Sequence, residues 1–164
     1  MDARRLLAAV LVLGSCAMGA GAQAAAQPTV TVQMGSDFGY NLGTQNVGSA
    51  FDMSLMLALS DNLQAAVTFL NGDATNFQSY RLLELYYSVI PRLGAIVSVG
   101  SQTSGAGSPF AVAGLGLYSN ILGRTVQGSL QTGLRLLVGY LMPVGNASFN
   151  TGTIRLGVVA WVGM

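Results

Sequence analysis

A side-chain alternation with a period of two residues is the feature that most restricts the fold of this chain. From Phe51 to Leu59 the odd-numbered positions hold Phe, Met and Leu, whereas the even-numbered positions hold Asp, Ser, Met and Ala. Successive side chains of a β-strand point to opposite faces, so this pattern predicts a strand with one apolar face. Similar alternation occurs in the segments 29–38, 49–59, 63–70, 80–90, 93–100, 110–118, 128–141 and 151–164. The chain is therefore predicted to be all-β.

Two arginines, Arg135 and Arg155, lie in the middle of very apolar segments. A buried arginine without a partner is costly, and a charge that faces lipid at the midplane of a barrel costs about 2–4 kcal/mol. Both arginines share the polar, glycine-rich face of their segments, and Asp52 and Glu84 do the same in theirs. We therefore expect these four side chains to form an ion-pair network inside a narrow lumen.

The low charge content indicates a membrane environment. Only 8% of the 164 residues are charged and 51% are hydrophobic, whereas soluble domains contain roughly 25% charged residues. Turn-forming clusters and charges interrupt the apolar runs before they reach the length of a spanning helix, so a closed barrel is the remaining way to cross a bilayer. We predict an eight-stranded antiparallel up-and-down transmembrane β-barrel with a polar, filled lumen. A soluble periplasmic barrel of the lipocalin type is the structural alternative.

The first 26 residues have the layout of a secretory signal peptide. Arg4 and Arg5 precede a short apolar core and a run of small residues, which favours cleavage before Gln27 and a barrel domain over 27–164. Without this peptide the charges sum to zero, so the composition gives no support to nucleic-acid binding. Cys16 in "LGSC" resembles a lipidation site, although an ordinary signal-peptide cysteine is the favoured interpretation.

The connections alternate in length. Tight turns are predicted at 60–62 and around Pro91, and longer loops at 39–48, 71–78, 101–109 and 142–152, while 120–127 is expected to be an unusually long inner turn. Aromatic residues collect at the two interfaces of such barrels. On this basis we expect the outward-facing Phe51, Phe69 and Tyr140 at the outer interface and Tyr87 at the inner one.

Strand number, alternation and short turns on one side resemble the small eight-stranded bacterial outer-membrane proteins typified by OmpX, the transmembrane domain of OmpA and OmpW. The resemblance covers 29–164 and involves no sequence-specific motif. It implies residence in the bacterial outer membrane, contact with its lipids, and recognition of the C-terminal strand by the barrel-assembly machinery. Members usually end in an aromatic residue, whereas this chain has Met164 in the corresponding outward register.

The residues give little support to catalysis. The chain contains no histidine, which most barrel hydrolases need as a base. Asp52 and Glu84 are expected to pair with arginines rather than to act as acid and base, and we expect no metal or cofactor site.

Two function classes remain. The first is a structural or surface-interaction barrel with a plugged lumen, whose loops would meet any extracellular ligand. The second is a narrow OmpW-like channel for small or hydrophobic molecules, favoured by the inward Met56, Leu82 and Ile96.

Overall fold

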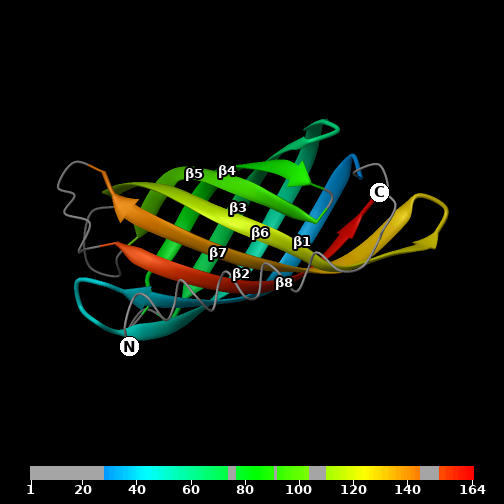
Figure 1. Ribbon diagram of the computed structural model, residues 1–164. Helices are drawn as coiled ribbons and strands as arrows, with labels where there is room; N and C mark the ends of the chain where they lie inside the picture. Colours follow the sequence, from blue (N-terminus) through cyan, green and yellow to red (C-terminus); the bar gives the residue numbers. More distant parts are fainter. Residues whose placement is uncertain (1–27, 74–76, 91, 104–109, 145–151) are drawn as a thin grey trace.

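The computed structural model describes residues 28–73, 77–90, 92–103, 110–144 and 152–164. In this part the strands pair in chain order and close into one antiparallel barrel (Figure 1). They are β1 (Val30–Asn41), β2 (Val47–Ser60), β3 (Leu63–Gly72), β4 (Ser79–Ile90), β5 (Leu93–Thr103), β6 (Phe110–Gln127), β7 (Leu130–Pro143) and β8 (Thr153–Gly163). The predicted eight-stranded all-β barrel is confirmed. The predicted signal peptide and Cys16 lie outside the described residues.

The strand register keeps the two faces separate from one strand to the next. On β2 and β3, for example, Leu55 lies opposite Val67 on the outside, while Ser54 lies opposite Thr68 on the inside. β1 and β8 close the ring in the same way, with Val32 opposite Val162 and Gln33 opposite Trp161. The alternation read from the sequence therefore corresponds to an outer and an inner wall.

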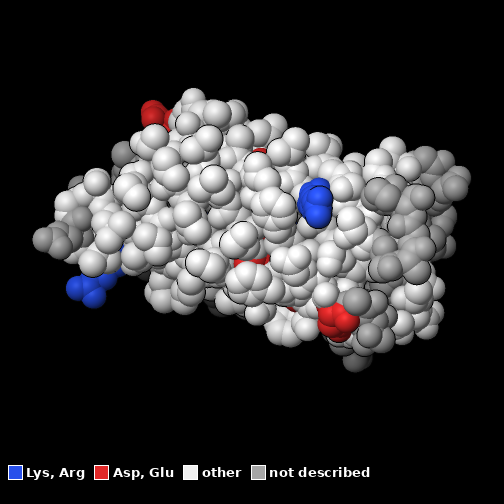
Figure 2. Space-filling view, turned by 180° about the vertical axis from the view of Figure 1, so that it is seen from behind, with Lys and Arg blue, Asp and Glu red and all other residues white. Residues whose placement is uncertain are grey.

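The outer wall is apolar and the inner wall is not. Outward side chains such as Leu55 and Leu115 are 51% and 69% exposed, while the charged side chains of Asp52, Glu84 and Arg155 are buried inside. Figure 2 accordingly shows only isolated charged residues on one face of the molecule. A soluble barrel would have the opposite distribution, so the exposed apolar belt indicates a membrane location. No helix in the described part of the chain is long and apolar enough to cross a membrane.

Lipid contact at individual positions tests this register. Leu55, Leu85 and Val158 are 51%, 46% and 43% exposed on the outer wall, and Leu136 is half-buried there. Spin labels at these four positions should be accessible to oxygen dissolved in the bilayer. A label at Ser54 or Gly157, which are buried inside, should be shielded from it. Accessibility at Ser54 equal to that at Leu55 would contradict the register, because a slip by one residue reverses every side chain.

Short connections lie at one end of the barrel and longer connections at the other. Asp61 and Asn62 join β2 to β3, and residues 91–92 join β4 to β5, at the end where β1 begins and β8 finishes. The strand ends that flank the longer connections, 42–46, 73–78, 104–109 and 144–152, lie together at the other end, on the left of Figure 1. We refer to these as the turn end and the loop end. The predicted alternation of short and long connections is confirmed.

The prediction of a long turn at 120–127 is wrong. These residues continue β6, which pairs with β7 up to a tight turn at Gly128 and Ser129. Gly128 has a φ of 57°, the left-handed conformation that two-residue hairpin turns require and that glycine adopts without strain. The register shifts near Ile121 and Val126 and interrupts the alternation, which is why the segment did not read as a strand. The resulting hairpin reaches past the other turns in Figure 1.

Candidate functional site: the filled lumen

Glycines on the inner wall create the space that neighbouring side chains fill. A Cβ at Gly94 would overlap the Tyr118 ring, and one at Gly133 would overlap the Trp161 ring. A Cβ at Gly157 would in the same way overlap the Asp37 carboxylate. An eight-stranded barrel has an interior just wide enough for side chains. The glycine-rich face therefore accommodates large rings and charged groups in a lumen that would otherwise be overfilled.

Arg155 on β8 is the centre of the polar interior. Its Nη2 atom lies 2.7 Å from Asp37 Oδ2 and 3.3 Å from Asp52 Oδ2, and its Nη1 atom lies 3.0 Å from Glu84 Oε1. Its Nε atom also donates to Asp37 Oδ2 at 2.8 Å. These carboxylates come from β1, β2 and β4, so one guanidinium joins β8 to three other strands. Arg155 is 4% exposed, and its charge is compensated entirely within the protein.

Hydroxyl groups donate hydrogen bonds to two of these carboxylates, those of Glu84 and Asp52. Glu84 Oε2 accepts hydrogen bonds from Thr68 at 2.7 Å and from the Tyr86 hydroxyl at 2.9 Å, while Oε1 accepts one from Ser98 at 2.8 Å. Ser54 donates to Asp52 Oδ1 at 3.0 Å. A buried charge is tolerated only when it is paired and hydrogen-bonded. The donors around Glu84 meet this condition and hold the carboxylate toward Arg155.

The structure places Arg135 differently from the sequence-based prediction. It lies inside and is 4% exposed, as expected, but its described partners are neutral. Its Nε donates to Asn120 Oδ1 at 2.8 Å, and its Nη1 donates to Gln33 Oε1 at 3.2 Å and contacts Met56 Sδ at 3.4 Å. No carboxylate among the described residues lies within 4.0 Å of it. The expected pairing of Asp52 and Glu84 therefore involves Arg155 and not Arg135.

Two aromatic rings, and not carboxylates, stabilise the charge of the Arg135 guanidinium. The guanidinium carbon of Arg135 lies 5.3 Å from the centre of the Tyr86 ring and 4.8 Å from that of Tyr118. Both distances are within the range of favourable cation–π contact. Gln33 also donates to Ser54 at 3.1 Å and to the Tyr86 hydroxyl at 3.4 Å. Arg135 and the Arg155 cluster are thus linked through a continuous set of hydrogen bonds.

Asp37 is the lumen residue that the sequence reasoning missed. It is fully buried and belongs to the closest ion pair of Arg155. Asp37 has the same odd parity as Thr31 and Gln33, so counting in twos along β1 places it inside. The predicted strand 29–38 ends one residue beyond it. Asp37 Oδ1 has no hydrogen-bond partner among the described residues and faces Gly157.

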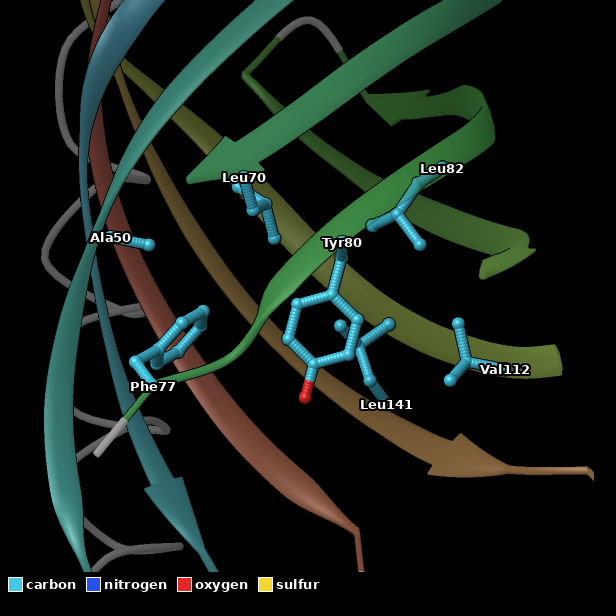
Figure 3. Packing of buried hydrophobic residues seen from close by; sticks show 7 residues of the cluster. All are labelled: Ala50, Leu70, Phe77, Tyr80, Leu82, Val112 and Leu141. Atoms are coloured by element: carbon cyan, nitrogen blue, oxygen red, sulfur yellow. The ribbon is translucent and has the colours of Figure 1, made fainter. Parts of the chain in front are cut away.

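Apolar side chains close the lumen on the loop-end side of the ion pairs. Figure 3 shows this cluster, which consists of Ala50, Leu70, Phe77, Tyr80, Leu82, Val112 and Leu141. Phe77 comes from the connection before β4, and its ring packs against Tyr80 at 5.7 Å between centroids. It occupies the space over Gly39, and its backbone N–H donates to Asp73 Oδ1 at 2.9 Å. A second cluster contains Met56, Ala66, Tyr86, Ile96, Tyr118, Leu137 and Val159.

A small pocket adjoins the ion pairs. A cavity of about 10 Å³ lies beside Glu84, Ser98 and Arg155, next to the paired glycines Gly116 and Gly139. This is room for about one water molecule. Across the residues that the structure describes, no group of His, Cys, Asp and Glu side chains is arranged to hold a metal ion. The carboxylates that converge here bind a guanidinium instead.

The four predicted interface aromatics all lie on the outer wall. Phe51, Phe69 and Tyr87 are 49%, 38% and 53% exposed, and Tyr140 is half-buried with its ring over Gly152. Phe51, Phe69 and Tyr140 are in the loop-end halves of their strands, whereas Tyr87 is near the turn end. Further outward aromatics near the loop end are Phe38, Tyr40 and Phe110. Their depth in a bilayer stays a prediction.

Comparisons with known proteins add a single general result. No protein-family model matches the chain, and no curated protein matches it. A solved structure described as "De novo design of transmembrane beta-barrels" is similar, with 16% sequence identity, a TM-score of 0.49, and coverage of 82% of this chain and 97% of that one. The assignment of the fold depends on the strand pairing and on which side chains are buried. The chain is an eight-stranded antiparallel closed β-barrel with polar residues and salt bridges buried inside it.

Proposed function

We propose that this protein is an integral β-barrel of the bacterial outer membrane, of the same kind as OmpX, the OmpA transmembrane domain and OmpW, with a structural or surface-interaction role. The observation that carries the proposal is the reversed distribution of side chains. Apolar residues are exposed around the barrel, while Asp37, Asp52, Glu84 and Arg155 are buried and paired within it. This arrangement suits lipid outside and a filled interior.

A plugged lumen is the part of the proposal that separates it from a channel. The ion pairs extend across the lumen from β8 to β1, β2 and β4. The Phe77 cluster covers them on the loop-end side. The cavity beside Arg155 holds about 10 Å³, so an ion that followed this route would have to displace the side chains around it. Interaction with an extracellular ligand would then involve the loop end rather than the interior.

Location and conduction can be tested separately. The full chain, expressed in a bacterial host, should fractionate with the outer membrane and migrate faster on a gel when unheated than when boiled. Refolded into planar bilayers, it should give no stable single-channel steps. Recovery in the soluble periplasmic fraction would refute the membrane assignment. Regular conductance steps that Arg155→Leu alters would instead support a channel through the lumen.

A narrow channel for small or hydrophobic molecules is the second candidate. It is favoured by Met56, Leu82 and Ile96, which point inward as expected and are buried in the two apolar clusters. Uptake of a hydrophobic fluorescent probe into vesicles that contain the protein would support this candidate. Uptake equal to that of protein-free vesicles would exclude it.

We also propose that residues 1–26 are a signal peptide removed before Gln27, and that the assembly machinery recognises β8. The arginines and apolar core described above support the first proposal. The second is supported by the apolar outward series on β8, which includes Leu156, Val158 and Val162 and continues to Met164. N-terminal sequencing of the membrane form would identify the cleavage site, and mass spectrometry would reveal a lipid on Cys16.

A further inference from the structure

We infer that the outer wall near the loop end binds the phosphate headgroup of an anionic lipid through Arg81. This inference rests on the proposed membrane location. Arg81 is exposed on β4, with the same outward parity as Leu83 and Leu85. In the described strands it is the one charged residue on the outer wall of the barrel itself, since Arg124 lies on the extended hairpin.

The Arg81 guanidinium has no counter-charge within the described part of the chain. The ion pairs of the described residues all involve Arg155, and the hydrogen bonds of these residues do not include the Arg81 side chain. Directly across the strands it faces Phe69 on β3 and Ser101 on β5. An unpaired guanidinium on an apolar wall is unfavourable unless an anion or water accompanies it. Its position therefore favours a negatively charged group from outside the chain.

Polar groups lie on the loop-end side of Arg81 on the outer wall. Asn71, Ser79, Ser101 and Thr103 lie on β3, β4 and β5 with outward parity, close to the loop end of each strand. Ser79 is opposite Thr103 in the sheet, directly beside the Arg81–Ser101 pair. The Thr103 hydroxyl donates to the Ser79 carbonyl oxygen, and Ser79 Oγ accepts from the Gly72 N–H, so the Ser79 hydroxyl still has its proton to donate. Hydroxyl and amide groups next to a guanidinium are suited to a phosphate, which accepts several hydrogen bonds and pairs with arginine in a bidentate manner. We call these five residues the Arg81 patch.

The position of the Arg81 patch along the barrel axis favours a lipid headgroup as its ligand. From Arg81 to Ile90, at the other end of β4, the chain rises about 30 Å at ~3.3 Å per residue. With a strand tilt of about 40° this corresponds to roughly 23 Å along the barrel axis, close to the ~25 Å of the apolar band of such barrels. Arg81 therefore lies where the hydrocarbon ends and the phosphates begin. Aromatic Phe69 at the same level is typical of this boundary.

Fluorescence quenching in vesicles tests the site. A tryptophan placed by Phe69→Trp reports the lipids next to Arg81, and the background from Trp161, which is buried in the lumen, is subtracted using the unsubstituted protein. Quenching is compared in phosphatidylcholine vesicles that contain either brominated phosphatidylglycerol or brominated phosphatidylcholine. We expect about fivefold preferential binding of phosphatidylglycerol, the ratio that corresponds to about 1 kcal/mol for one arginine near a membrane surface. Arg81→Gln should reduce the preference to about one.

Tyr140→Trp is the matched control, because Tyr140 is an outward aromatic in the loop-end half of β7, three strands away from Arg81 on β4. The tryptophan of Tyr140→Trp should be quenched equally by brominated phosphatidylglycerol and brominated phosphatidylcholine, both with Arg81 present and in combination with Arg81→Gln. Equal quenching of Phe69→Trp by both lipids, or a preference that survives Arg81→Gln, would overturn the site while leaving the membrane barrel intact. Absence of quenching by both lipids would refute the membrane location itself, and the site with it.

Discussion

Arg155→Leu should lower the free energy of unfolding by about 3–5 kcal/mol, because it leaves buried carboxylates without their cation. Asp37, Asp52 and Glu84 all lie within 4.0 Å of the Arg155 guanidinium. Leucine fills part of the volume but compensates none of the charge. Urea unfolding of the refolded protein in phospholipid vesicles, followed by tryptophan fluorescence, would measure the loss.

Two further variants show whether the effect belongs to the ion pairs. Arg124→Leu removes an exposed arginine from the hairpin and should change the free energy of unfolding by less than about 0.5 kcal/mol. Arg155→Leu combined with Glu84→Gln should cost less than the sum of the single changes, since the pair at 3.0 Å is then removed from both sides. Strict additivity would show that Glu84 and Arg155 are not coupled, which would contradict the ion pair.

Phe77→Ala should cost about 3–5 kcal/mol, the usual loss when a buried phenylalanine is truncated. Phe77 is 2% exposed and fills the space between Gly39 and Tyr80. The ion-pair layer beneath it stays intact, so we expect the variant to remain non-conducting in planar bilayers. Chemical unfolding gives the first quantity and single-channel recording gives the second.

Phe51→Ala is the matched control for Phe77→Ala. Phe51 is 49% exposed on the outer wall, so its truncation should cost about half as much or less, because the hydrophobic contribution follows the area that is buried. Equal losses for the two variants would mean that the Phe77 ring contributes no more packing energy than a ring on the outer wall. Conductance that appears only with Phe77→Ala would identify this ring as the barrier to ions.

The difference between Arg135 and Arg155 changes the order of the expected mutational effects. Sequence reasoning treated the two arginines as equivalent members of one ion-pair network. In the structure Arg135 is held by Asn120, Gln33 and two aromatic rings. Removing it leaves neutral groups unsatisfied rather than charges, and this penalty is smaller. The coupling expected between Glu84 and an arginine therefore belongs to Arg155.

Parity along each strand was determined by the sequence alone. Counting in twos placed Asp52, Glu84, Arg135 and Arg155 inside and Phe51, Phe69, Tyr87 and Tyr140 outside, and the structure agrees for all eight. This succeeds because a strand that meets lipid on one side and a crowded lumen on the other has a different composition on each face. The strand count followed from the same pattern.

Only the tertiary structure decided which inward groups meet. Arg155 reaches Asp37, Asp52 and Glu84 because barrel closure and strand stagger bring β1, β2 and β4 to one height, and parity contains no information about height. The extension of β6 to Gln127 likewise depends on pairing with β7, which continues across shifts in register that interrupt the alternation. The local pattern thus determined the direction of each side chain, whereas its partners were determined by the register around the closed barrel.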